Sequence, residues 1–544
     1  MEQNVTTRDS QAAGQTARPD SAGPKSTVLV VGASGYVGGR LVPRLLESGW
    51  RVRAAGRSIE KLMCRPWASH PACEIVRVDA MDAESLKAAI HECETMFYLV
   101  HSMSDRGKGF EDADRRAAYA TVEAANSQSQ ASGGSLGRII YLSGLVPDDP
   151  QISSHLRSRA EVARILGLGQ VPVTTLRAAQ ILGSGSASFE IIRYLADRLP
   201  VMLTPRWVRM ETQPIAVSNV LDYLEGCLEH PETTGKSYDI GGPDILSYTD
   251  LFHLYAAVAG LRRRLILPVP FLTPRLSAHW LNVITPVPYG LAGPLVQGLR
   301  NRVVCAENSI RDVIPVTLVD CRTAIGRALD KVRQHAVATC WTDAGAIVEP
   351  EWLAEGDAGY AGGTVLQDGY GIRIAAAPEQ VWEPVQRLGG ETGWYHTDWL
   401  WWIRGAMDKF AGGVGLRRGR RHPVDLRAGD ALDFWRVLSV RHADHLLLLA
   451  EMKLPGQAML EIRTVPHGSE TELQMRAWFL PRGLWGIIYW YAVYPLHGIV
   501  FKGMLRSVAE KVSEKAGGNT EQASVRKLSP EKPSSCKLMR SDDA

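Results

Sequence analysis

The segment Thr27-Val-Leu-Val-Val31, followed directly by Gly32-Ala-Ser-Gly35-Tyr-Val-Gly38, decides the fold of the first part of this chain. An apolar run, a glycine turn and apolar residues at helical spacing predict a strand, a turn and a helix start. A side chain at Gly32 or Gly35 would hold the backbone away from a pyrophosphate, and one at Gly38 would separate the helix from the strand. The alternative is an ordinary glycine-rich turn. We predict a dinucleotide site that includes Gly32, Ser34, Gly35, Tyr36, Val37 and Gly38.

The bulk composition limits the domain count and the partners. At 544 residues the chain exceeds what one hydrophobic core sustains, so two or three domains are expected. The 61 Lys and Arg residues nearly balance the 58 Asp and Glu residues, for a net charge of +3. No overall field therefore favours nucleic acid, and no nucleic-acid partner is predicted. The eight cysteines form no C-x-x-C pair and no signal peptide is recognised, so we expect a cytoplasmic protein without a metal site.

Apolar runs alternate with helical segments through the first 300 residues. This alternation predicts an α/β fold, a doubly wound parallel Rossmann sheet with helices on both faces, over residues 27–330. Residues 1–26 and 516–544 are polar and are expected to be disordered tails. The predicted strands are Thr27–Val31, Val52–Ala55, Ile75–Val78, Thr95–Val100, Arg138–Leu142, Val173–Leu176 and Tyr238–Ile240.

Ligands of such sheets bind beyond the carboxyl ends of the strands, so the residues after each run are candidates. Arg57 stands after the second strand, where an NAD-selective fold carries a carboxylate, and it can pair with a 2′-phosphate. NADP(H) is therefore the preferred cofactor, with NAD(H) as the other option; a solvated loop arginine is the alternative. Asp79 can accept a hydrogen bond from the adenine amino group. Val100 and His101 follow the fourth strand at the height of the nicotinamide ribose, where their backbones are better candidates than their side chains.

Three further strand ends extend the pattern: Tyr98-Leu-Val-His-Ser102, Ile140-Tyr-Leu-Ser-Gly144 and Leu176-Arg-Ala-Ala179. Together with the glycine motif they resemble an atypical extended short-chain dehydrogenase/reductase of the NmrA-like, NAD(P)-binding type, over about residues 27 to 330. The sequence is most similar to a bacterial two-domain family that joins this domain to a C-terminal domain of unknown function. The resemblance implies either an oxidoreductase or, as in some NmrA-like relatives, a domain that holds the nucleotide without turning it over.

The resemblance also implies a catalytic serine after the fifth strand and a Tyr-x-x-x-Lys on the next helix. Ser143 matches the serine, but His155 and Arg159 stand where tyrosine and lysine would be. Their i, i+4 spacing puts them on one helical face. We expect His155 to carry the proton, Arg159 to hold the nicotinamide ribose or an oxyanion, and Ser143 to orient the carbonyl. The alternative is that loss of the tyrosine marks a domain without catalysis.

Residues 276–299 contain no charged residue, and their prolines and glycines argue against a straight membrane helix. In extended reductases this region closes over the substrate, so an apolar lip favours an apolar substrate such as a quinone, an isoprenoid or another lipid-like molecule. A covered packing surface is the alternative.

Residues 331–365 are predicted to be a linker and residues 366–515 a second, α+β domain. Gly371–Ala375, Gly429–Val437, Leu446–Glu451, Ala458–Thr464 and Glu472–Phe479 are the predicted strands. Alternation in the last strand predicts a half-buried antiparallel sheet. A helix over 377–382, these strands and a helix from Gly483 to about Val512 resemble the helix-grip fold of SRPBCC/START-like domains, which implies a lipophilic pocket.

Gly483 to Phe501 contains no charged residue, and we interpret it as a pocket-lining helix rather than a membrane span. Trp399, Trp401 and Trp402, followed by Arg417, Arg418, Arg420 and Arg421, leave peripheral contact with the inner face of the membrane open. The sequence thus predicts an NADP(H)-binding oxidoreductase for a small apolar substrate. The alternatives are a redox sensor or assembly factor, and a lipid or quinone carrier. The oligomeric state stays open.

Overall fold

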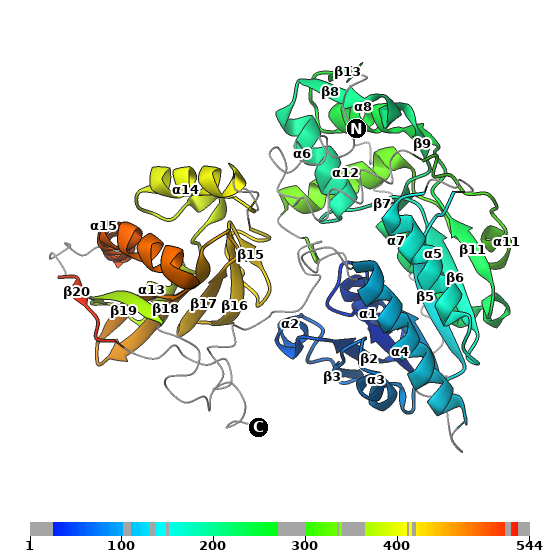
Figure 1. Ribbon diagram of the computed structural model, residues 1–544, viewed down its shortest axis with the longest axis horizontal. Helices are drawn as coiled ribbons and strands as arrows, with labels where there is room; N and C mark the ends of the chain where they lie inside the picture. Colours follow the sequence, from blue (N-terminus) through cyan, green and yellow to red (C-terminus); the bar gives the residue numbers. More distant parts are fainter. Residues whose placement is uncertain are drawn as a thin grey trace, which may run out of the picture.

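The computed structural model describes residues 25–101, 110–130, 136–147, 152–269, 301–334, 337–339, 365–410, 413–415, 420–516 and 524–530. The predicted apolar lip at 276–299, most of the predicted linker, and Arg417 and Arg418 lie outside these residues. Figure 1 shows the α/β domain beside a second domain that carries its own sheet.

The first domain contains a seven-stranded sheet whose strands are all parallel. The order β11-β6-β5-β4-β1-β2-β3 reverses direction between β1 and β4, which is where a doubly wound sheet opens a crevice for its ligand. All seven predicted strands are confirmed. They are β1 (Thr27–Val31), β2 (Arg51–Gly56), β3 (Cys73–Arg77), β4 (Thr95–Tyr98), β5 (Arg138–Gly144), β6 (Val173–Ala178) and β11 (Ser237–Ile240).

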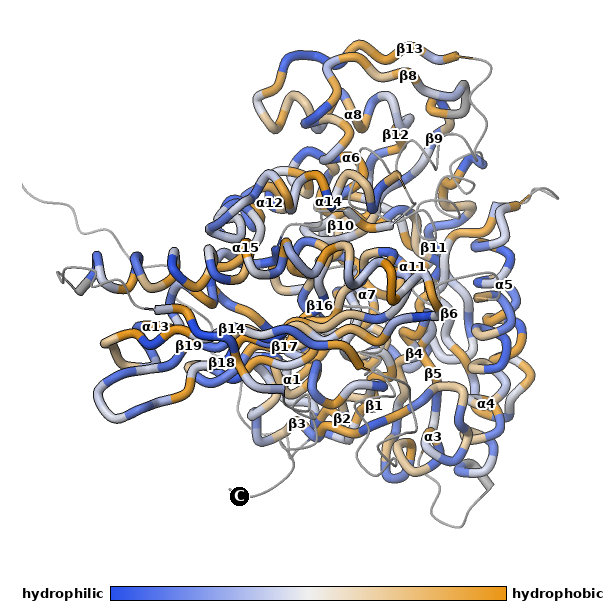
Figure 2. Tube along the Cα trace, turned by 60° about the vertical axis from the view of Figure 1, so that its left-hand side comes forward, coloured by the Kyte–Doolittle hydropathy of each residue, from blue (hydrophilic) through white to orange (hydrophobic). Residues whose placement is uncertain are grey.

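Helices cover both faces of this sheet, and each face has its own core. On one face α1 (Gly38–Glu47), α2 (Ile59–Met63), α7 (Val217–Glu229) and α11 (Ile310–Val313) contribute to the core. On the other face the core is built with α3 (Ala83–Ile90), α4 (Phe110–Gln130) and α5 (Ser154–Leu166). Figure 2 shows α4 and α5 alternating between hydrophilic and hydrophobic colours, as expected for helices with one face on the sheet.

A smaller unit extends the domain beyond the strand ends and has a separate core. Its helix α12 ends at Arg333, so the first domain continues past residue 330. The unit is made of β7 (Ile181–Leu182), α6 (Ala187–Arg198), β8 (Val201–Pro205), η2 (Arg206–Arg209), β9 (Glu211–Thr212), β10 (Ile215–Ala216), β12 (Leu246–Ser247), α8 (Tyr248–Val258), β13 (Leu265–Val269) and α12 (Cys321–Arg333). The short helix η3 (Pro231–Thr233) instead follows α7 and bonds to β5 and β6 of the parallel sheet.

The second domain is an antiparallel sheet of order β15-β16-β17-β18-β19-β14-β20. Its core lies between the sheet and the helices α13 and α15, as an α+β fold requires. The helix-grip assignment stays a prediction. The elements are β14 (Leu366–Ile374), α13 (Pro378–Val385), η6 (Gly390–Thr392), α14 (Asp398–Phe410), β15 (Ala431–Leu432), β16 (Trp435–Arg441), β17 (His445–Ala450), β18 (Gly456–His467), β19 (Glu470–Pro481), α15 (Gly483–Ala516) and β20 (Arg526–Lys527).

Three expectations for this domain need correction. The single strand predicted over Gly429–Val437 is a hairpin, because Asp433 adopts a φ of 55° and turns the chain between β15 and β16. The sheet is not half-buried: Glu472 and Arg476, on the face predicted to be polar, are 1% and 8% exposed. Part of the predicted C-terminal tail explains this burial, since β20 pairs with β14 and Arg526 forms an ion pair with Glu472.

Helix α15 is long and apolar enough, by length and composition, to cross a membrane. Its second half is nevertheless part of the core, where Met504, Leu505 and Val508 are at most 1% exposed. The apolar stretch that meets this criterion is only 22% buried, so the core contacts of the second half do not account for it.

Candidate functional site

The glycine turn is constrained by backbone contacts rather than by side chains. Gly32 has a φ of +95°, and a Cβ placed there would lie 2.8 Å from the Leu99 carbonyl oxygen. At Gly38 a Cβ would lie 2.3 Å from the Gly32 carbonyl oxygen, so the helix approaches the strand as closely as the sequence predicts. The Cβ of an alanine at Gly35 would have more room, 3.2 Å from the same oxygen. The turn is thus shaped as a cradle for a phosphate group.

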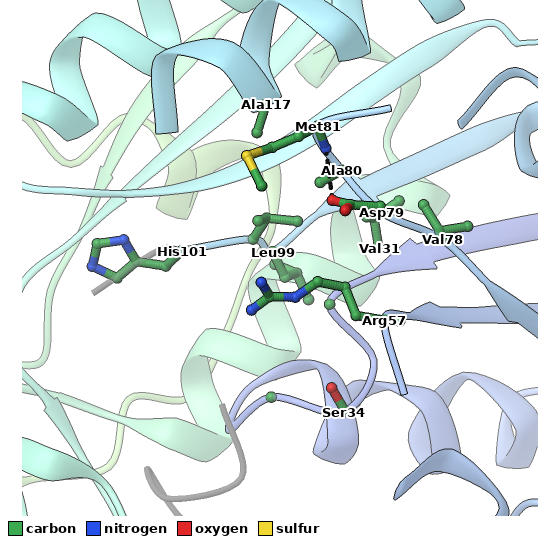
Figure 3. A pocket seen from close by; sticks show the side chains of 14 residues that line it. Val31, Ser34, Arg57, Val78, Asp79, Ala80, Met81, Leu99, His101 and Ala117 are labelled. Atoms are coloured by element: carbon green, nitrogen blue, oxygen red, sulfur yellow. Dashed lines mark hydrogen bonds between the residues drawn. The ribbon is translucent and has the colours of Figure 1, made fainter. Parts of the chain in front are cut away.

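A pocket opens at the carboxyl ends of β1, β2 and β4 (Figure 3). Seven of the predicted cofactor residues line it: Gly32, Ser34, Gly35, Arg57, Asp79, Val100 and His101. The half-buried Arg57 extends into the pocket, whereas Asp79 accepts a hydrogen bond of 3.0 Å from the Met81 N–H with Oδ1. Both residues line the pocket at the ends of β2 and β3, beside the glycine turn.

Tyr36, Val37 and Gly38 do not line this pocket. The Tyr36 ring lies under the Arg40 guanidinium, at 4.4 Å, and its hydroxyl faces Gly183 of the smaller unit. Val37 packs against the core of the α1 face. Their side chains therefore shape the turn, and only their backbone could meet a nucleotide.

His101 at the opposite end of the pocket meets His155, the residue that the sequence places on α5. The ring centroids are 5.0 Å apart. Asp114 on α4 lies behind them: its Oδ2 is 3.4 Å from His101 Nδ1 and accepts a hydrogen bond of 2.9 Å from Ser158. Nε2 of His101 and Nδ1 of His155 are buried without a hydrogen-bond partner among the described residues, whereas Nδ1 of His101 faces the Asp114 carboxylate. Orphaned ring nitrogens at the end of a ligand pocket are typical of groups that await a substrate.

Arg159 joins this cluster to the backbone of the pocket. Its Nη1 donates to the Val100 carbonyl and to the Tyr141 hydroxyl, both at 3.3 Å. Ser143 is buried and its hydroxyl donates to the Arg159 carbonyl at 3.5 Å, not to either histidine. The structure therefore brings His155 and Arg159 together with His101. Ser143 contacts only the Arg159 backbone of this group.

Burial changes the protonation of the two histidines. Desolvation, with the Arg159 charge adding to it, lowers the pKa of His101 to about 4, although Asp114 opposes the shift. Desolvation also lowers the pKa of His155 well below its usual value, with His101 and Arg159 contributing. Both rings are therefore neutral near pH 7.

Asp114 and Tyr141 were not predicted from the sequence. Asp114 is 3% exposed on the apolar face of α4, next to Ala117 and Ala118, and an acid on such a stripe is the signal that could have singled it out. Tyr141 lies two residues before Ser143 on the same face of β5. No local motif marks it, because its contact with Arg159 depends on how α5 packs.

Comparison with known families follows the same division. Residues 32–171 match the NAD(P)H-binding family, and residues 360–504 match a family described as a protein of unknown function, DUF2867. The first domain is of the NAD(P)H-binding Rossmann type. The second match leaves the activity of the C-terminal domain open.

The curated relatives are similar to the first domain at low identity. NADH dehydrogenase (ubiquinone) 1 alpha subcomplex subunit 9 of Arabidopsis thaliana is 24% identical over 53% of this chain and 72% of that protein. Divinyl chlorophyllide a 8-vinyl-reductase of Zea mays is 25% identical over 43% of this chain and 59% of its own length. Ceramide reductase of Caulobacter vibrioides is 25% identical over 36% of this chain and 58% of its own.

Among solved structures, WbmG of Bordetella bronchiseptica in complex with NAD is 14% identical, with a TM-score of 0.45, over 59% of this chain and 97% of that chain.

Proposed function

We propose that the protein is an NADP(H)-dependent oxidoreductase that acts on an apolar carbonyl, quinone or isoprenoid-like compound. The observation that carries the proposal is one pocket with a phosphate cradle and Arg57 at one end and His101 at the other, where the ring of His155 lies against His101 outside the pocket lining. A bound nicotinamide would supply or accept the hydride. Two of the relatives are reductases by name, one of them of ceramide, which favours an apolar substrate.

His155 is the proposed proton carrier at the substrate oxygen. Reduction of a carbonyl adds a hydride to carbon and a proton to oxygen, and the reverse reaction removes both. His155 and Arg159, one turn apart on α5, contact the lining residues His101 and Val100, and in this proposal His155 exchanges the proton while Arg159 stabilises negative charge on oxygen. His101 and Asp114 are proposed positioning residues, since Asp114 holds the His101 ring and that ring packs against His155.

The proposal is tested by NADPH consumption. Fluorescence titration should show NADPH binding, and a panel of quinones and enones should include one compound that oxidises NADPH with matching product. Absence of binding by the folded protein would reject the proposal, as would NADPH binding without turnover on any member of a broad panel.

Arg57 should select the cofactor. Replacing Arg57 with serine removes a charged partner for a 2′-phosphate, so NADPH affinity is expected to fall about tenfold to a hundredfold, the equivalent of about 1.5–3 kcal/mol. NADH affinity should change little. Arg51→Ser, at the exposed opposite end of the same strand, is the matched control and should leave both affinities intact. Equal losses for the two coenzymes in Arg57→Ser would contradict a 2′-phosphate contact.

The depressed histidine pKa values give the reaction a direction-dependent pH profile. Alcohol oxidation needs a neutral His155 ring as base, so its kcat/KM should stay flat between pH 6 and 8 and fall only well below pH 6.5. Carbonyl reduction needs a protonated ring, so its kcat/KM should rise as the pH falls through the same range. Initial rates in both directions measure this, and a break near pH 6.5 in the oxidation profile would contradict it.

A second candidate function is that of a nucleotide sensor. It is favoured by hydrogen bonds that connect the glycine turn to residues distant in the sequence. Arg65 donates to the Ser34 carbonyl and to the Ala338 carbonyl, and Thr339 donates to the Tyr36 carbonyl at 2.8 Å. A Cβ at Gly429 of the second domain would touch the Lys61 side chain of α2. Hydrogen exchange separates the candidates: a sensor would show NADPH-dependent protection at residues 427–430 and no turnover.

A further inference from the structure

Two helices of the second domain present apolar stripes to solvent. On α14 the stripe consists of Trp399, Trp402, Ile403, Met407 and Phe410, which are 42–96% exposed and recur every three or four residues. On α15 it consists of Leu484, Trp485, Ile487, Ile488, Tyr491, Leu496 and Ile499, which are 41–77% exposed. An exposed surface of this kind marks an interaction site rather than a core.

The stripes are not a by-product of burial elsewhere on the same helices. On α15, Trp490 and Phe501 pack toward the sheet on the opposite side and are 5% and 4% exposed. On α14, Trp401 packs against Trp394 and Phe434 of the core. Each helix therefore has one apolar face in the core and a second apolar face in water.

The two helices run in opposite directions and are joined at their ends. Tyr395, just before α14, lies under Lys511 near the end of α15, with the ammonium 5.0 Å from the ring. At the other end one loop holds both helices. Lys453 donates its N–H to Asp408 at 2.6 Å, and the Arg482 N–H donates to the Pro455 carbonyl at 2.8 Å. The stripes thus lie on two helices that are joined at both ends, and together we call them the α14–α15 face.

Basic residues gather at one end of the α14–α15 face. From Gly483 to Phe501 the chain has no charged residue, whereas Arg404, Lys409, Lys453 and Arg482 lie where the two helices meet the loop. Of the two acids on α14, Asp408 is 1% exposed and accepts hydrogen bonds from the Gly415 and Lys453 backbones, and the exposed Asp398, at the other end of the helix, accepts one from the Trp394 N–H. A hydrophobic surface rich in tryptophan and tyrosine, with basic residues at its edge, is the combination that binds the interface of an anionic bilayer.

We propose that the α14–α15 face docks on the surface of an anionic phospholipid bilayer. The helices lie in the interface with the tryptophan rings among the headgroups and acyl chains, and the basic cluster faces the lipid phosphates. The face does not span the bilayer, because the core residues of α15 hold the helix against β14 and β19. This inference is independent of the oxidoreductase activity.

Flotation of the full-length protein with vesicles tests the docking. Binding is expected to vesicles of phosphatidylcholine with a quarter phosphatidylglycerol, and to be about tenfold weaker with phosphatidylcholine alone. The variant W402E/W485E/Y491E should lose binding by at least about tenfold, since each change places a carboxylate in the stripe. Because all three side chains are exposed, its thermal unfolding should match the parent.

The matched control is the variant L168E/L265E, which places glutamates at residues of the first domain that are 60% and 54% exposed. It should bind vesicles like the parent. Sedimentation of the lipid-free protein distinguishes other occupants. A dimer that the triple variant dissociates, without vesicle binding by the parent, would overturn the proposal in favour of a second copy of this chain. Resistance of the bound protein to alkaline carbonate would overturn the interfacial geometry in favour of insertion.

Discussion

Replacing His155 with phenylalanine should lower kcat for NADPH-dependent reduction by about a hundredfold to ten-thousandfold, the usual contribution of a positioned proton carrier. Phenylalanine keeps a ring against His101, whose centroid lies 5.0 Å away, so packing is retained while both ring nitrogens are lost. NADPH affinity should change by less than about threefold, because His155 does not line the nucleotide end of the pocket. Stopped-flow NADPH oxidation and a fluorescence titration give the two numbers.

The matched control is His253→Phe. His253 is half-buried on α8, where its Nε2 lies 3.1 Å from the Arg264 carbonyl, and it is remote from the pocket. It should leave kcat unchanged. His101→Phe is expected to lower kcat less than His155→Phe. It should also move the pH profile, because the variant lacks the His101 charge that lowers the pKa of His155. Equal NADPH oxidation by the parent and His155→Phe would show that the proton comes from another group.

The parallel sheet could be predicted because its strands are apolar on both faces and each is closed by a glycine or polar turn. Val28, Leu29 and Val30 are all fully buried, because helices cover both faces of the strand. The strand is therefore an unbroken apolar run, whereas a surface helix alternates apolar and polar residues. The glycine turn adds a second local signal, because Gly32 and Gly38 leave no room for a side chain. These signals lie within short stretches of sequence, and no distant contact is required to interpret them.

The candidate site was predictable only where strand ends carry it. Arg57, Asp79 and His101 follow β2, β3 and β4, so topology alone brings them to one edge of the sheet. The contact of His101 with His155 also depends on where α5 begins, which the Ser153 cap fixes by accepting the Leu156 N–H. Asp114 enters from a third element, and no spacing in the sequence links it to the two rings.

The second domain was less predictable because distant segments decide its burial. The alternation in β19 correctly places Leu473 and Met475 in the core, yet the opposite face is covered by residues 524–530, which the polar composition of the tail conceals. Arg476 donates to the Ser529 carbonyl at 2.7 Å, a contact between residues far apart in the chain. Periodicity reports the apolar face of a strand, but not whether another segment covers its polar face.

Three glycine-to-alanine variants should separate the fold of the nucleotide turn from its binding role. Gly38→Ala forces α1 away from β1, because the new Cβ would lie 2.3 Å from the Gly32 carbonyl oxygen and neither backbone can yield cheaply. We expect a loss of about 3 kcal/mol in the free energy of unfolding, together with loss of NADPH binding. Denaturant unfolding and NADPH titration on the same preparation measure both effects.

Gly35→Ala is the informative member of the series. Its Cβ would clear the Gly32 carbonyl oxygen by 3.2 Å, which the turn can absorb, and Gly35 lines the pocket whereas Gly38 does not. The free energy of unfolding should therefore fall by less than about 1 kcal/mol while NADPH affinity drops at least about tenfold, since the methyl group occupies space that a phosphate needs. Gly326→Ala is the control: Gly326 lies in α12, a Cβ there meets nothing closer than 3.9 Å, and the variant should be neutral or slightly stabilised with normal binding. If Gly35→Ala bound NADPH like the parent, the turn would be a structural feature of the strand–helix junction rather than the phosphate site, and the pocket would have to hold its ligand in another way.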